Sequence, residues 1–165
     1  MTTLVAGLSN PSGLALDLAG DKMYCANDDY EDSCVTVLDG ATDSILRRIG
    51  VGNPALALAL NPAANKVYVA VYYRDSVAVI DASADTVVDW VPVAQQPTQL
   101  LYVGRGSQVC CIGNTDSVVV IDCATDRVIA TLSAGLEPGA IEYSPASRTV
   151  FVANRHGSSI TRISD

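Results

Sequence analysis

Apolar and polar positions follow a pattern that recurs four times along the chain. Each recurrence opens with a proline in a polar turn, and these prolines lie 43, 43 and 41 residues apart, at Pro11, Pro54, Pro97 and Pro138. A short apolar segment follows each proline, then a small polar turn and a second apolar segment. Successive side chains of a strand point to opposite faces, so a segment that is apolar throughout predicts a strand covered on both faces.

The pattern predicts four strands in each of the first three repeats and three in the last. The first strands cover 14–16, 56–60, 100–103 and 141–143, and the second strands begin at Lys22, Lys66, Gln108 and Thr149. The third strands end at Asp39, Asp81, Asp122 and Ser164. A fourth, more polar strand follows a turn that ends in Asp in each of the first three repeats (SILRRIGV, TVVDWVPV and RVIATLSA).

Four short antiparallel strands in a unit of about 40–45 residues are typical of one blade of a β-propeller. We therefore predict an all-β propeller with four blades of four antiparallel strands per chain. The predicted parts are a closing outer strand in 1–9, then blades in 10–52, 53–95, 96–136 and 137–165, the last with three strands. A solenoid would need a shorter repeat, and a sandwich would not keep so regular a period.

One segment occurs twice, as TLVAGL in 3–8 and as TLSAGL in 131–136. The second copy closes the third blade, so the first copy, from Thr3 to Leu8, is predicted to be the outer strand of the fourth blade. Closure within one chain would make a four-bladed ring. Closure between two chains would make an eight-bladed homodimer by strand exchange, which is the interpretation we favour. A third interpretation is a fragment of a longer propeller.

The second repeat carries a family resemblance in its motif NP…NKVYVA…SVAVID, which covers 61–62, 65–70 and 76–81. This motif resembles the YVTN-type β-propeller repeat, whose blades the resemblance places in rings of about seven or eight. The chain departs from the motif at Cys110 and Cys111, where Tyr and Val are expected, and at Arg162 and Ser164. The resemblance is specific for the fold and says little about function.

Composition and charge exclude several classes of partner. The net charge is −8, from 18 acidic and 10 basic residues, which argues against nucleic acid and anionic membrane surfaces. No apolar run reaches about 18 residues, so no membrane insertion is expected. The chain shows no signal peptide and is predicted to be soluble, with its compartment unknown.

The five cysteines fit no metal or redox spacing, so no metal site and no cofactor is expected. Most of them replace buried residues of the repeat. Cys34 lies on the strand beside Cys25, which leaves a bridge between them open.

Ligands of propellers generally bind at the mouth of the central channel. The candidate ligand-binding residues lie in the loops expected there: Asp28, Asp29, Tyr72, Tyr73, Arg74, Asn114, Asn154, Arg155 and His156. The acidic loop that includes Asp28 and Asp29 is suited to calcium or is simply solvated. The loop of Tyr72, Tyr73 and Arg74 is suited to stacking on a sugar or a peptide. Its alternative interpretation is a packing role within the protein. His156 is a candidate base, anion site or metal ligand, or an exposed histidine.

Other acids have a structural interpretation beside the functional one. The recurring Asp39, Asp81 and Asp122 are predicted to cap the turn after each third strand. Asp17 and Glu142 lie on inner strands, and paired acids there would suit hydrolysis.

We therefore predict a non-catalytic scaffold that binds a protein, a peptide or a small molecule, with no catalytic residue assigned. The resemblance also admits a propeller enzyme, such as a lactonase-like hydrolase or an oxidoreductase, with its site at the channel mouth. A converging set of His, Glu and Arg side chains would favour that alternative. A third alternative is a structural module of a cell surface.

Overall fold

The computed structural model describes residues 5–93 and 96–164. Within them lie β-strands and one turn of 3₁₀ helix, η1 (Tyr72–Arg74). The strands of the first half are β1 (Pro11–Asp17), β2 (Lys22–Asn27), β3 (Cys34–Asp39), β4 (Ile45–Gly50), β5 (Ala55–Asn61), β6 (Lys66–Val71), β7 (Ser76–Asp81) and β8 (Thr86–Pro92). Those of the second half are β9 (Pro97–Val103), β10 (Gln108–Gly113), β11 (Ser117–Asp122), β12 (Arg127–Ser133), β13 (Pro138–Ser144), β14 (Thr149–Asn154) and β15 (Ser159–Ser164).

The strands form four antiparallel sheets, each built from strands that are consecutive in the sequence. Blade 1 is β1-β2-β3-β4, blade 2 is β5-β6-β7-β8 and blade 3 is β9-β10-β11-β12. Blade 4 is the three-stranded sheet β13-β14-β15. Consecutive strands pair because each turn between them is short and polar. Left-handed turn residues such as Asn65 and Asp85 reverse the chain at these turns.

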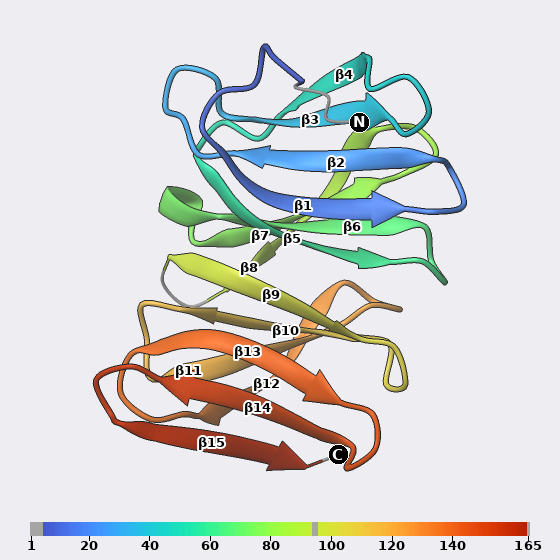
Figure 1. The fold of residues 1–165 in the computed structure, drawn as a ribbon. Helices are drawn as coiled ribbons and strands as arrows, with labels where there is room; N and C mark the ends of the chain where they lie inside the picture. Colours follow the sequence, from blue (N-terminus) through green and yellow to red (C-terminus); the bar gives the residue numbers. More distant parts are fainter. Residues whose placement is uncertain (1–4, 94–95, 165) are drawn as a thin grey trace.

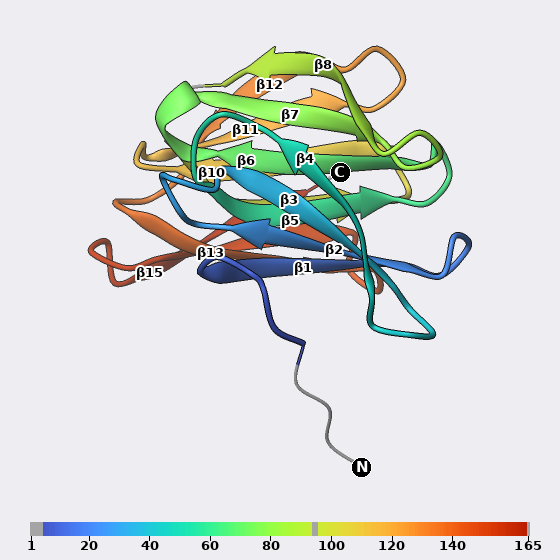
Figure 2. The same ribbon diagram turned by 90° about the horizontal axis from the view of Figure 1, so that it is seen from above.

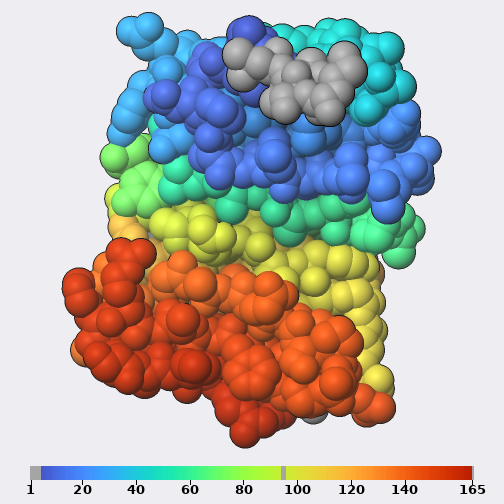
Figure 3. Space-filling model, in the orientation of Figure 1, coloured from blue at the N-terminus to red at the C-terminus, as the bar shows by residue number. Residues whose placement is uncertain are grey.

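The blades are stacked in a row with blade 1 and blade 4 at opposite ends (Figure 1). Seen from above, β8 and β12 lie along one side of the stack and β1 and β13 along the other (Figure 2). The surface shows the same order, from blue at one end to red at the other (Figure 3). The inner strands β1, β5, β9 and β13 contact one another in sequence order.

The hydrophobic core consists of three clusters, one between each pair of neighbouring blades. Blade 2 contributes Val69 and Ile80 to the first cluster and Tyr68 and Val79 to the second. Adjacent residues of one strand thus enter different cores, which explains why the middle strands are apolar at nearly every position.

The recurring aspartates cap turns as predicted. The Asp39 carboxylate accepts hydrogen bonds from the backbone N–H groups of Ala41 and Thr42, and Asp122 accepts one from the backbone of Thr125. Hydrogen bonds from the threonine hydroxyls add to these and hold the pKa of Asp39 and of Asp122 below the ordinary value. These residues are structural.

A second aspartate in the same turn fastens neighbouring blades together. In blade 2, Asp85 accepts a hydrogen bond from the Tyr24 hydroxyl at 2.6 Å and pairs with the Lys22 ammonium at 2.7 Å, both from blade 1. In blade 3, Asp126 accepts a hydrogen bond from the Tyr68 hydroxyl of blade 2 at 2.6 Å and pairs with Lys66. We call each set of Lys, Tyr and Asp an interblade clasp.

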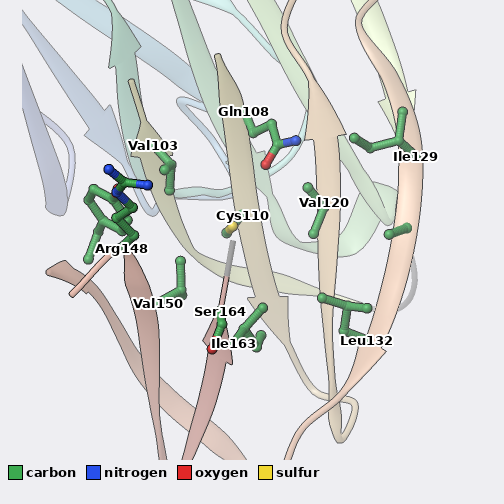
Figure 4. A pocket seen from close by; sticks show the side chains of 12 residues that line it. Val103, Gln108, Cys110, Val120, Ile129, Leu132, Arg148, Val150, Ile163 and Ser164 are labelled. Carbon is green, nitrogen blue, oxygen red and sulfur yellow. The ribbon is translucent and has the colours of Figure 1, made fainter. Parts of the chain in front are cut away.

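Within residues 5–93 and 96–164, the junction between blades 3 and 4 shows no such clasp. Gln108 and Cys110 occupy the strand positions that Lys66 and Tyr68 hold in blade 2. A cavity of about 200 Å³ lies there, lined by Cys110, Val120 and Leu132 of blade 3 and by Val150 and Ile163 of blade 4 (Figure 4).

The N-terminal segment departs from the single-chain form of the prediction. Thr3 and Leu4 lie outside the described residues, and 5–8 belong to no strand. The Gly7 carbonyl accepts a hydrogen bond from Arg48 of β4, and Val5 and Leu8 line a hollow with Leu14 and Met23 of blade 1. The segment lies against blade 1 because blade 4 is at the far end of the row (Figure 1). Within the described residues, no N-terminal strand joins blade 4, and the four blades form an open row.

Candidate functional site

Two sets of loops meet on one face of the stack, as the sequence predicts. One set joins the outer strand of a blade to the next inner strand, and the other joins the second strand of a blade to its third. The Tyr72 N–H donates to the Pro54 carbonyl at 3.1 Å, and the Arg155 N–H donates to the Glu137 carbonyl at 2.8 Å. These backbone hydrogen bonds link the two sets within a blade, so their side chains form one surface, which we call the loop face.

Three tyrosines gather on the loop face where blades 1 and 2 adjoin. The ring centroids of Tyr30 and Tyr73 are 5.4 Å apart, and those of Tyr72 and Tyr73 are 4.6 Å apart with the rings nearly perpendicular. The Asn114 side-chain amide donates to the Tyr72 hydroxyl at 2.8 Å and to the side-chain oxygen Oε1 of Gln96 at 2.6 Å. This network holds the Tyr72 side chain in place.

Arg74 contacts a tryptophan of the outer strand. Its guanidinium carbon lies 3.8 Å from the centroid of the Trp90 ring on β8. A guanidinium over an indole face is a favourable cation–π contact. The candidate trio of Tyr72, Tyr73 and Arg74 therefore does not form a single site, and Arg74 belongs to the outer-strand packing.

The acidic loop is largely occupied by its own contacts. The Asp29 carboxylate accepts the backbone N–H of Glu31 at 2.7 Å and that of Asp32 at 3.3 Å. Asp32 accepts a hydrogen bond from Ser9 and pairs with Arg48, and these contacts lower its pKa, the Ser9 hydrogen bond most. Among residues 5–93 and 96–164, no three His, Cys, Asp or Glu side chains are grouped to hold a metal ion.

A second polar group lies at the blade 4 end of the loop face. Glu137 contacts the His156 ring, and one of its carboxylate oxygens lies 3.5 Å from the Arg155 guanidinium. The side chains of Arg155 and His156 are 70% and 75% exposed. The group unites Glu, His and Arg, yet solvent screens it, and exposed ion pairs contribute little.

Asn154 lies outside the loop face, contrary to its place among the candidates. It is the last residue of β14, is buried, and donates from its amide to the hydroxyls of Ser159 and Thr161 at 3.1 and 3.0 Å. Asn27 donates in the same way to Thr36 at 2.9 Å in blade 1. Both asparagines fasten a second strand to a third strand.

The remaining candidates do not come together. Asp17 and Glu142 lie in blades 1 and 4, at opposite ends of the row (Figure 1), so they form no acid pair within the chain. Cys25 and Cys34 are buried free thiols. Burial raises the pKa of Cys110 to about 11 and that of Cys111 to about 12, so both stay protonated at neutral pH.

The sequence places Tyr30, Gln96 and Glu137 in the expected loops, but they are not among the candidate ligand-binding residues. Tyr30 lies in the acidic loop, and its partner Tyr73 lies 43 residues further along the chain. That separation equals one repeat, so aligning Tyr30 with Tyr73 by the repeat period would have placed them in equivalent loops of adjacent blades.

Comparison with solved structures agrees with this architecture. The chain is similar to hydrazine synthase from Kuenenia stuttgartiensis, with a TM-score of 0.84 and 20% identity over 99% of this chain and 48% of that one. The fold is propeller-like. The prediction of an all-β, propeller-like fold is thereby confirmed, and at this identity the likeness concerns the fold alone.

The chain spans about half the length of that hydrazine synthase chain. No family model matches the sequence, and no curated protein matches it. The resemblance to YVTN-type repeats accordingly stays a prediction. In the described part of the chain, no helix is long and apolar enough to span a membrane.

Proposed function

We propose that the chain is a non-catalytic propeller scaffold that binds a ligand on its loop face and assembles as a homodimer by exchanging N-terminal strands. One observation carries the assembly. Ile160 of β15 is 68% exposed, whereas Val35, Val77 and Val118, which hold its position in the other blades, are fully buried. Blade 4 has the same pairing of its first three strands as the other blades, but Ile160 lacks the structural neighbours that cover Val35, Val77 and Val118.

Across the described residues, two neighbours are missing at Ile160. One is a following blade, because Val35, Val77 and Val118 each belong to the core cluster shared with the next blade, and the other is an outer strand. Val35, Val77 and Val118 each lie opposite one buried or half-buried apolar residue of an outer strand: Ile49, Val91 and Leu132. Within the described residues, β15 has a partner only on its β14 side, so its other edge keeps unpaired backbone groups. An open edge of this kind favours the addition of a strand.

The first copy of the repeated segment fits that edge. In blade 3, TLSAGL places Leu132 opposite Val118. The same register would place Leu4 of TLVAGL opposite Ile160, and Thr3 opposite Thr161. In a two-fold ring the partner's blade 1 would adjoin blade 4, so the partner's N-terminal segment would have to leave only its contacts with its own blade 1 to reach this edge.

The two ends of the row are apolar as well. On blade 1, Leu14 and Leu16 are 64% and 53% exposed, whereas their counterparts Leu58 and Leu60 in blade 2 pack against a core. On blade 4, a hollow is lined by Phe151, Ala153 and Ile160. Contiguous exposed apolar surface favours association. In a two-fold ring, the free face of each blade 1 would cover the free face of the partner's blade 4.

A hydrolase is a second candidate, and the contact between Glu137 and His156 is the observation in its favour. The exposure of this group argues against it, because catalytic acids and bases depend on a site that excludes water. Measured hydrolysis of lactone and ester substrates that disappears in His156→Ala would replace the scaffold interpretation with this one.

Light scattering tests the assembly. The chain should have twice its 17.2 kDa mass in solution, and Leu4→Asp and Ile160→Asp should each make it monomeric. Val88→Asp is the matched control, because Val88 is exposed on the rim strand β8, and it should remain dimeric.

A cross-link tests the register. The double variant with cysteines at Leu4 and Ile160 should form a disulfide-linked dimer on oxidation, whereas each single variant should not. A wild-type monomer of full stability, or a cross-link within one chain, would contradict the proposal.

A further inference from the structure

The tyrosine cluster of Tyr30, Tyr72 and Tyr73 is well ordered by contacts yet open to solvent. Tyr30 and Tyr73 are 69% and 52% exposed, the largest exposures of any aromatic side chain among the described residues. Two exposed rings in contact on a loop surface leave much apolar area in water, where it favours a partner.

The cluster lies in negative surroundings. Asp28 precedes Tyr30 in the same loop, and its charge acts on the Tyr30 hydroxyl. The hydrogen bond between Tyr30 and Tyr73, and then burial, raise the pKa of Tyr30 to about 12, with a smaller effect from Asp28, so the ring stays neutral. Within the described residues, neither the Asp28 nor the Glu31 carboxylate accepts a hydrogen bond, in contrast to Asp29 and Asp32.

The cations of the chain nearest in sequence are engaged elsewhere. Arg74 follows Tyr73 directly but lies over Trp90. Lys22, the cation nearest to Tyr30 in sequence, pairs with Asp85, and Lys66 pairs with Asp126. The electron-rich faces of Tyr30 and Tyr73 therefore lack a cation from their own loops. The face of a tyrosine attracts a cation, and the attraction grows when acidic groups stand close by.

We infer that Tyr30 and Tyr73, with Tyr72 as support and Asp28 as counter-charge, form a recognition site for an alkylammonium or guanidinium group. The inference rests on the proposed binding role of the loop face and gives that role a ligand class. The network from Asn114 through Tyr72 positions the perpendicular ring against which Tyr73 rests, so the platform exists before the ligand arrives. The net charge of −8 attracts the same class of ligand from a distance.

A comparison of choline with its neutral carbon isostere, 3,3-dimethylbutan-1-ol, distinguishes the effect of ligand charge on binding from the effect of ligand shape. Titration followed by NMR should show saturable binding of choline and none of the neutral alcohol. Tyr30→Leu combined with Tyr73→Leu should weaken choline binding at least about fivefold, whereas Tyr30→Phe combined with Tyr73→Phe should stay within about twofold, since phenyl rings keep the π face. Asp28→Asn should weaken it about threefold, whereas Asn substitution at Asp29, which caps its own loop, should not.

Two further probes distinguish the source of the cation. A short peptide with one trimethyl-lysine that binds more tightly than choline identifies a peptide ligand, and the reverse order identifies a small free cation. Equal binding of choline and the neutral alcohol, full affinity in the double Leu variant, or binding of methyl glucoside instead of choline would overturn the inference.

The site lies within one chain, on blades 1 and 2, so the titration is repeated on the Ile160→Asp variant. Choline binding to an Ile160→Asp monomer, with dimeric wild type, supports both ideas. A dimer that binds no cation leaves the assembly standing and overturns the cation site. A wild-type monomer that binds choline overturns the assembly and leaves the cation site standing.

Discussion

The junction between blades 2 and 3 differs sharply from the junction between blades 3 and 4, although both are built from the same repeat. At the former, Asp126 holds Tyr68 and Lys66 of the preceding blade. At the latter, Cys110 and Gln108 hold the corresponding strand positions, and a cavity of about 200 Å³ lies beside Cys110 (Figure 4). The backbone pairing of the strands is the same in blade 2, which contains Tyr68, and in blade 3, which contains Cys110.

The difference shows that strand pattern and blade packing are separable. A strand needs only apolar residues and a paired edge, and both β6 and β10 have these. Firm packing needs large side chains that fill the junction and a partner for each polar atom they carry into it. Tyr68 and Asp126 satisfy each other, whereas Cys110 fills less space and carries no strong polar group.

The largest expected effect comes from breaking the clasp at the tighter junction. Asp126→Asn keeps the left-handed turn conformation, which Asn tolerates, but removes the charge that balances Lys66. We expect a loss of about 2–3 kcal/mol in the free energy of unfolding, the size of a hydrogen bond to a charged group. Urea denaturation at fixed protein concentration measures this loss.

Asp43→Asn is the control for this variant. Asp43 holds the same turn position in blade 1, also with a left-handed backbone, but it is exposed. Its substitution should change stability by less than about 0.5 kcal/mol. Equal effects at the two positions would show that the turn, and not the clasp, accounts for the stability.

A smaller effect is expected from filling the looser junction. Cys110→Leu places additional methyl groups into the cavity and should stabilise the protein by about 1 kcal/mol. Cys111→Leu, one residue away, points into the packed core between blades 2 and 3 and should destabilise it through overpacking by about 1–3 kcal/mol.

Thermal denaturation of these two variants should move the midpoint in opposite directions. Destabilisation by both would mean that another segment, such as the partner strand, already occupies the cavity.

The smallest effect is the share of the clasped tyrosines in a dependence of stability on alkaline pH. Burial, and then the hydrogen bond to Asp126, raises the pKa of Tyr68 far above its ordinary value of 10.0, and Tyr24 with Asp85 behaves likewise. The folded state keeps these protons while the unfolded state loses them. The contribution of these two tyrosines to stability is therefore complete well below pH 10, and it declines as the pH approaches and passes 10.

At pH 10 the loss should be about 0.4 kcal/mol for each of the two tyrosines. Urea denaturation between pH 8 and pH 10 measures this slope. The buried thiols Cys110 and Cys111, whose pKa values are also raised, add to this slope. Tyr68→Phe should therefore remove only about 0.4 kcal/mol of the loss at pH 10, and an unchanged loss in that variant would assign the effect to other groups.

Much of the fold could be predicted from the sequence because its signals are local. The prolines at 43-residue spacing and the polar turns locate the strands, and the capping roles of Asp39 and Asp122 follow from their position in a turn. The candidate site was predicted less well. Tyr72 and Tyr73 do lie on the loop face, but Arg74 turns to Trp90 and Asn154 is buried. Side-chain direction at a strand end depends on neighbours from other strands, which a linear pattern does not specify.

The sequence by itself determined the all-β class, the four units and the polar or apolar character of each strand, because these depend on residue type and on alternation along one strand. Only the tertiary structure decided which residues meet: Tyr30 with Tyr73 across two blades, Asp126 with Tyr68 across a junction, and the N-terminal segment with blade 1. These contacts join residues far apart in the chain, and their geometry depends on how one sheet stacks on the next.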